Sequence, residues 1–184
     1  MIYLKLLKNI FLSFLFIFFL TNFVQAKCNF GINIGDNISN LKNELAEEFI
    51  EESIINDISG SIIDFCPNEN FDENIYVNFT FVAKELASIR IIVQNRTKEN
   101  ITSNKLSLMN YAKQNYGDFN TGQNPKAYNN FKVWRGNNNL IVYKRILNHK
   151  EIFEEEIYIT NNIYQLKLDE VNALLELKKF KGEN

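Results

Sequence analysis

The side chains best suited to chemistry in this 184-residue chain are one histidine, two cysteines and many carboxylates. His149 is the single histidine and lies in a predicted turn between Asn148 and Lys150. One histidine excludes a multi-histidine metal site and confines any histidine base to that turn. A solvent-exposed turn residue is the plainer interpretation of His149.

Carboxylates gather on one predicted helix and in one predicted strand. Paired carboxylates can hydrolyse glycosides, but the sequence does not show two of them converging across a cleft. In the strand, Glu154 and Glu156 share one face and leave Glu155 on the other, where burial costs several kcal/mol unless the charge is paired. An edge strand protected by charge is favoured over a metal site. The helix acids are interpreted as a solvated face: Glu47, Glu48, Glu51 and Glu52.

Recognised catalytic motifs are absent from the sequence. It contains no Gly-x-Ser-x-Gly elbow, phosphate loop, dinucleotide fingerprint, EF-hand or His-Glu-x-x-His pattern. The sequence therefore assigns no catalytic, cofactor-binding or metal-binding residue, and it favours a protein that is not an enzyme. Trp134 and Arg135 form a candidate interaction surface, because both residue types are enriched in binding hot spots. The alternative is that Trp134 is a core residue of its predicted strand.

Residues 1–26 have the pattern of a secretory signal peptide. Lys5 and Lys8 precede the apolar run Ile10–Leu20, and Val24 and Ala26 supply the small residues before a cleavage site. We predict cleavage after Ala26, which leaves residues 27–184 as one periplasmic or secreted domain with no stable membrane insertion. The alternative is an uncleaved anchor, because the uncharged stretch of about 17 residues is near the lower limit for a membrane span.

The two cysteines, Cys28 and Cys66, are predicted to form a structural disulfide in an oxidising compartment. A redox-active pair is the less favoured alternative, because the chain has no Cys-x-x-Cys motif. Lipidation of Cys28 is disfavoured, since Lys27 occupies a place where a lipoprotein signal needs a small residue.

Composition limits the partners that can be expected. Loss of the two signal-peptide lysines would leave 18 basic against 22 acidic residues, a net charge of about −4, so nucleic acid is not an expected partner. The bias towards Asn, Ile and Lys is typical of an AT-rich genome. Four sequons begin at Asn37, Asn78, Asn95 and Asn100, and chance explains them at least as well as glycosylation.

The first half of residues 27–184 is predicted to contain a strand, a helix and a hairpin. Phe30–Ile34 alternates as a short strand, and Asp36 offers a cap to an amphipathic helix whose apolar positions continue weakly to about Gly60. Alternation over 75–82 and 86–93, with a turn between them, predicts an antiparallel hairpin.

The second half is predicted to contain a helix, three strands and a final helix. The helix covers Lys105–Tyr116 and is closed by Gly117, and residues 118–130 form a loop. Strands are predicted over 131–135, 140–147 and 152–160. Residues 163–168 are either a short strand or the start of the last helix, for which Asp169 is a candidate cap.

This order of elements predicts an α+β fold in which helices pack on one face of an antiparallel sheet. It also suggests two related helix-plus-hairpin halves, residues 27–97 and 98–184.

The stretch from Phe30 to Leu45, with Gly35, Asp36 and Ser39 between a strand and an amphipathic helix, resembles the opening of small β-lactamase-inhibitor-like envelope proteins. These include the small lipoprotein of the barrel-assembly machinery. Here Glu47-Glu48-Phe49 stands where the family usually has Gly-x-Pro, and the lipidated cysteine is missing. The resemblance implies a helix-on-sheet module and an envelope location, and it transfers no functional residue.

The sequence thus favours an exported, non-catalytic interaction module of the periplasm or envelope, whose partner is another envelope or extracellular protein. Its oligomeric state is left open. The alternative is a small envelope hydrolase or ligand-binding protein that uses carboxylates near the loop Asp118–Asn130.

Overall fold

A computed structural model of the chain describes residues 28–41, 45, 49–50, 53–69, 71, 75–95, 107–117, 130–136, 138–147 and 153–182. The predicted signal peptide, the four helix acids, His149 and the loop up to residue 129 lie outside these ranges. The predictions made for them therefore stay predictions.

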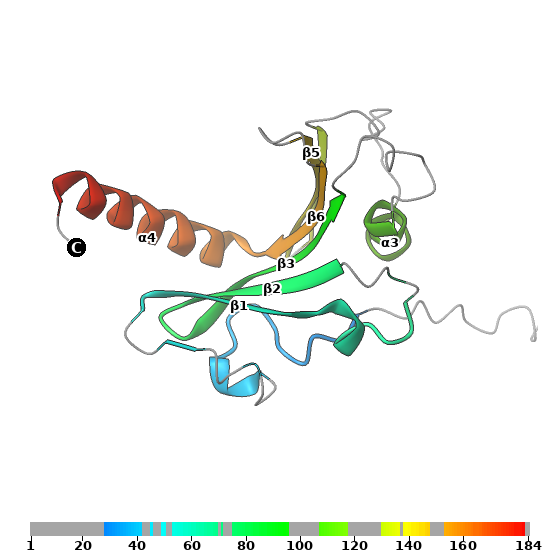
Figure 1. Ribbon diagram of the computed structural model, residues 1–184, viewed down its shortest axis with the longest axis horizontal. Helices are drawn as coiled ribbons and strands as arrows, with labels where there is room; N and C mark the ends of the chain where they lie inside the picture. The colour runs from blue at the N-terminus through cyan, green and yellow to red at the C-terminus, as the bar shows by residue number, and fades with distance from the viewer. Residues whose placement is uncertain are drawn as a thin grey trace, which may run out of the picture.

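The described residues form one antiparallel sheet of six strands, in the order β1-β2-β3-β6-β5-β4 (Figure 1). Together with two α-helices, this sheet confirms an α+β fold. The strands are β1 (Ile55–Ser61), β2 (Ile75–Val82), β3 (Glu85–Asn95), β4 (Asn130–Arg135), β5 (Leu140–Leu147) and β6 (Phe153–Thr160).

The hairpin of β2 and β3 matches its prediction closely. Its alternating side chains place Val77, Phe79 and Ile91 in the core, and Val77 pairs directly with Ile91 across the two strands. The connecting turn has Ala83 and Lys84 at φ values of 49° and 72°. Positive φ at both central residues suits the right-handed twist of the flanking strands.

Helix α3 (Ser107–Tyr116) confirms the predicted helix, and Gly117 follows it at a φ of 98°. Helix α4 (Asn162–Lys181) begins earlier than the predicted cap at Asp169. The side chain of Asn161 accepts a hydrogen bond from the Tyr164 N–H and is the actual cap. The polar pair Asn161-Asn162 therefore begins the helix directly after β6, with no further strand between them.

The main core lies on one face of the sheet. Phe79, Ile91 and Ile157 from three neighbouring strands pack there against Leu108 and Ala112 of α3. A smaller cluster on the opposite face joins Leu168 of α4 to Val82 and Ala87. The two helices thus pack against opposite faces, so the expectation that helices share one face is not confirmed.

The predicted strand Phe30–Ile34 is not formed. Gly31 and Gly35 have φ values of 66° and 97°, which break an extended strand on both sides. The chain instead crosses the core face and is held by hydrogen bonds to the β2–β3 hairpin, including Gly35 N–H to Leu86 O at 2.8 Å. The helical turn that follows is η1 (Ile38–Asn40), capped by Asn37 and not by Asp36.

The weak continuation of the first helix to about Gly60 is wrong, because Ile55–Ser61 is strand β1. Ile58 is fully buried and pairs with Phe79 of β2. Pairing along β2 and burial of a β-branched side chain outweigh a weak helical pattern. A 3-10 turn, η2 (Ile62–Asp64), then leads to Cys66.

Candidate functional site

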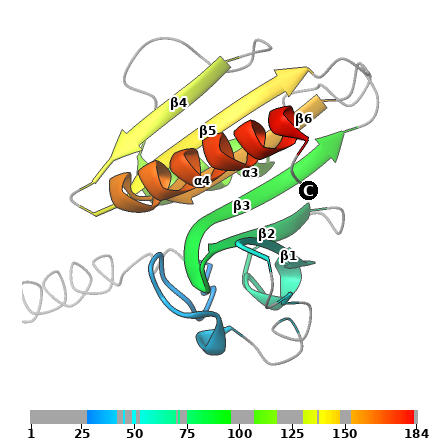
Figure 2. The same ribbon diagram turned by 90° about the vertical axis from the view of Figure 1, so that its left-hand side faces the viewer.

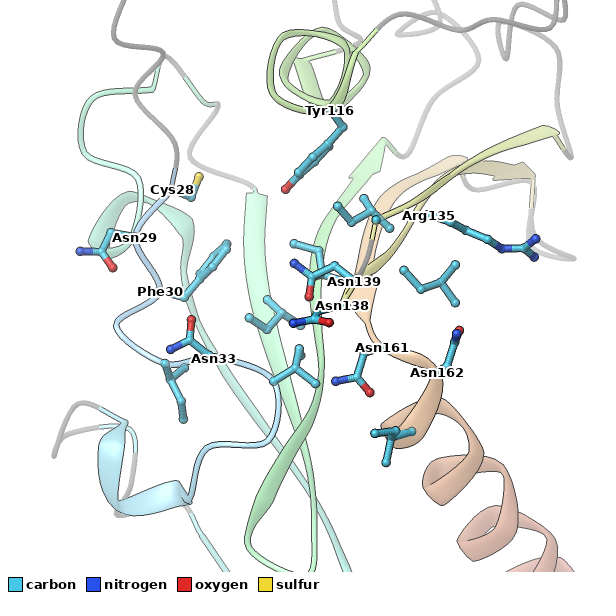
Figure 3. A pocket seen from close by; sticks show the side chains of 18 of the residues that line it. Cys28, Asn29, Phe30, Asn33, Tyr116, Arg135, Asn138, Asn139, Asn161 and Asn162 are labelled. Atoms are coloured by element: carbon cyan, nitrogen blue, oxygen red, sulfur yellow. The ribbon is translucent and has the colours of Figure 1, made fainter.

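An open cleft of about 1100 Å³ lies on the core face of the sheet, beside the part that α3 covers. Figure 3 shows Asn29, Phe30 and Asn33 on one side of it, and Asn138 and Asn139 on the other. Tyr116 reaches in from α3 at one end, and Asn161 and Asn162 stand at the other end, where α4 begins. We call this the amide-rimmed cleft.

Its floor is a row of isoleucines across three adjacent strands. Ile159 of β6 pairs with Ile89 of β3 on one side and with Ile141 of β5 on the other. All three side chains line the cleft. Because neighbouring strands are about 4.8 Å apart, this apolar strip is about 10 Å long.

Six asparagines from three separate segments form the rim: Asn29, Asn33, Asn138, Asn139, Asn161 and Asn162. Hydrogen bonds fix the backbone at two of these asparagines, Asn29 and Asn139. The Asn29 N–H donates to Phe65 O at 2.9 Å, and the Asn139 carbonyl accepts from Gly136 N–H at the same distance. A primary amide can donate and accept hydrogen bonds at once, so the rim suits neutral polar groups.

The wall formed by residues 28–34 is pinned by the predicted disulfide, which the structure contains between Cys28 and Cys66. Beside it, the Cys28 N–H donates to the Tyr111 hydroxyl of α3 at 3.1 Å. Phe30 packs edge-on against Phe79, with ring centroids 6.1 Å apart. The disulfide and the core together hold this wall in place.

Trp134 and Arg135, the predicted interaction pair, differ in exposure and orientation. Trp134 is half-buried and packs on Tyr116, with ring centroids 5.9 Å apart, which agrees with the core interpretation. Arg135 is exposed at the cleft edge, and its side chain points away from the centre (Figure 3). The two residues therefore do not form one continuous exposed patch.

A second exposed feature is the outer face of α4, formed by Ile163, Leu166, Leu174, Leu177 and Phe180. All five side chains are more than half exposed, and Phe180 is 92% exposed. They share one side of the helix, roughly opposite the side on which Leu168 and Val171 pack towards the sheet. The helix runs away from the sheet in Figure 1 and passes in front of it in Figure 2.

On the sheet face beneath α4, Glu156 is almost fully buried between two cations. Arg90 donates to both of its carboxylate oxygens, at 3.0 and 2.9 Å, and Lys144 lies 3.0 Å from one of them. The hydrogen bonds to Glu156 raise the pKa of Arg90. These contacts compensate the buried charge and leave a polar sheet surface.

Glu155 faces the other way and lies buried at the N-terminal end of α3. Its Oε1 accepts hydrogen bonds from the Met109 N–H at 2.7 Å and the Tyr143 hydroxyl at 2.9 Å. Its Oε2 has no hydrogen-bond partner among the described residues. Burial raises the pKa of Glu155 to about 7, although both hydrogen bonds oppose the rise.

The predicted edge strand around these glutamates is wrong. Strand β6 pairs with β3 on one side and β5 on the other, so it lies in the middle of the sheet. Glu154–Glu156 therefore does not protect an edge, and two of its three acids are buried.

No group of three or more His, Cys, Asp or Glu side chains in the described ranges is placed to hold a metal ion. Within the same ranges, no helix combines the length and apolar character needed to cross a bilayer.

Comparison with known proteins finds no matching family model, curated protein or solved structure.

Proposed function

We propose that this chain is an exported, non-catalytic interaction module that binds another envelope or extracellular protein through the outer face of α4. The observation that carries the proposal is the set of large apolar side chains on one side of that helix, in which Leu174, Leu177 and Phe180 lie three residues apart and Glu170 separates them from Ile163 and Leu166. Apolar side chains spaced by three or four residues on a helix are the usual anchors for docking into a partner's groove. Exposed apolar patches of this kind mark interaction sites.

Export is the second part of the proposal. It rests on the signal-peptide pattern of residues 1–26, and the disulfide between Cys28 and Cys66 is compatible with a periplasmic or secreted protein. The resemblance to β-lactamase-inhibitor-like envelope proteins adds less support, because residues 30–34 do not form the strand it implies.

The proposed relation between two halves stands beside the function. It is supported by the sheet order, in which β1 to β3 and β4 to β6 each form three consecutive antiparallel strands.

The alternative function is either a carboxylate-using hydrolase or a ligand-binding protein. The cleft favours the ligand-binding protein and not the hydrolase. Among the described residues that line the cleft there is no Asp or Glu. The described lining can hold a ligand but offers no carboxylate to act on it, which the hydrolase form of the alternative requires.

Site-specific photo-crosslinking tests the protein-binding proposal. A crosslinker at Leu174 or Leu177 is expected to capture one envelope or extracellular protein in the exporting host. The same crosslinker at Asn172, exposed on another side of α4, is the matched control and should not capture it. Equal products from all three positions, or a crosslinked dimer of this chain alone, would contradict the proposal.

A further inference from the structure

We propose that the amide-rimmed cleft binds a neutral carbohydrate about the size of a disaccharide. This site lies on the core face of the sheet, and the inference does not depend on a protein partner at α4.

The charge of the cleft selects an uncharged ligand. Its described lining contains no Asp, Glu or Lys, and the one cation, Arg135, points away from the centre (Figure 3). A charged ligand would lose its hydration there without gaining an opposite charge. Neutral polar groups lose less hydration free energy than charged groups when they enter the cleft.

The rim selects groups that both donate and accept hydrogen bonds. The side chains of Asn138, Asn139 and Asn162 are exposed and make no hydrogen bond to other described residues. Each amide therefore presents an oxygen acceptor and an NH₂ donor to the cleft. A sugar hydroxyl, which donates once and accepts twice, can match both groups of one amide.

The floor selects the shape. The isoleucine row of Ile89, Ile159 and Ile141 spans about 10 Å, given two strand spacings of about 4.8 Å, and Ile159 at its centre is the most exposed of the three. A pyranose ring has an apolar C–H face and hydroxyls around its edge. Two linked rings lying across this row would place a C–H face on Ile159 and hydroxyls towards the rim.

An extended peptide fits this cleft less well. Peptides that bind to sheets usually pair with an edge strand through their backbone. The floor here is the face of β3, β6 and β5, each of which has a neighbouring strand on both sides. A peptide backbone would have to satisfy its amides with side chains alone, so the carbohydrate is the favoured ligand.

The rim is also held in place before a ligand arrives. The Asn161 side-chain oxygen accepts from Tyr164 N–H at 2.9 Å, and the Asn29 backbone is tied to Phe65 beside the disulfide. Little ordering is then needed on binding, which favours affinity for a small ligand.

Saturation-transfer NMR and calorimetry with maltose, cellobiose and N,N′-diacetylchitobiose test the proposal on the purified protein. We expect at least one disaccharide to bind saturably with one site per chain. The double variant Asn138→Ala/Asn139→Ala should weaken that binding about 10-fold or more, because each amide hydrogen bond contributes a factor of several. Asn162→Ala should weaken it by a smaller factor, and Asn172→Ala on the opposite face is the matched control.

Thermal unfolding of each variant separates loss of binding from loss of fold. The proposal is overturned if a folded protein binds none of the three disaccharides, or if the double variant binds as well as the control. Binding of capped tetra-alanine that is lost in the double variant would also overturn it, since the cleft would then be a peptide site.

Discussion

Glu155 is predicted to make the chain more stable in mild acid than in mild base. Its pKa of about 7 in the folded chain compares with 4.5 for an unperturbed glutamate. The folded state therefore holds the proton more tightly than the unfolded state, and stability falls as the pH rises from about 4.5 to 7. The full difference corresponds to about 3 kcal/mol, most of which lies between pH 5 and pH 8.

Glu155→Gln mimics the protonated acid and keeps the oxygen that accepts from Met109 N–H and the Tyr143 hydroxyl. Nearby Arg145 of β5 lowers the Glu155 pKa less than burial raises it, so the direction holds. Urea unfolding, followed by the fluorescence of Trp134, measures stability at several pH values. The variant should match the parent at pH 5 and exceed it by about 2 to 3 kcal/mol at pH 8.

The matched control for this prediction is Glu170→Gln, which makes the same side-chain replacement on the exposed surface of α4. If the stability difference between parent and Glu155→Gln is the same at pH 5 and pH 8, the argument for a buried, protonated carboxyl is refuted.

Three further predictions concern stability and are measured by the same urea unfolding. Replacing both Cys28 and Cys66 by Ala should cost about 4 kcal/mol, because the disulfide closes a loop with a sequence separation of 38 residues; no measurable loss would contradict this. Glu156→Ala should cost about 2 kcal/mol, since Arg90 loses its hydrogen bonds to a charged group while both cations, each about a third exposed, stay in contact with water; a cost below about 0.5 kcal/mol would count against it. Ala83→Gly should stabilise the chain by about 1 kcal/mol, because Gly adopts positive φ without the strain of a Cβ; destabilisation would show that the turn is not strained.

Local patterns predicted the elements in which each residue's neighbours in sequence decide its structure. The hairpin of β2 and β3 follows from strict alternation, and the end of α3 follows from Gly117. Strand β1 was missed because Ile55 and Ile58 also suit a helix, and only pairing with β2 decides between the two.

Long-range pairing explains the other differences. The sequence predicts an edge position for strand β6 because nothing local shows that it pairs with β3, whose residues lie 58 to 70 positions earlier in the chain. The alternation of the strand predicts that Glu155 needs partners if it is buried. It does not predict that these partners are the Met109 N–H of α3 and the Tyr143 hydroxyl of β5. The cleft could not be predicted, because Asn29, Asn138 and Asn162 are far apart in the sequence and line the same cleft only in the folded chain.

Binding between the purified chain and the protein captured from α4 tests the central claim most directly. With the double variant Leu174→Glu/Leu177→Glu, we predict that the affinity falls about 100-fold, as expected when two apolar anchors are lost. Asn172→Glu, which adds charge on another side of the same helix, should leave the affinity within about two-fold, as is usual for residues outside the hot spot. Equal affinity for the double variant and the parent would contradict the claim that the outer face of α4 is the interaction surface.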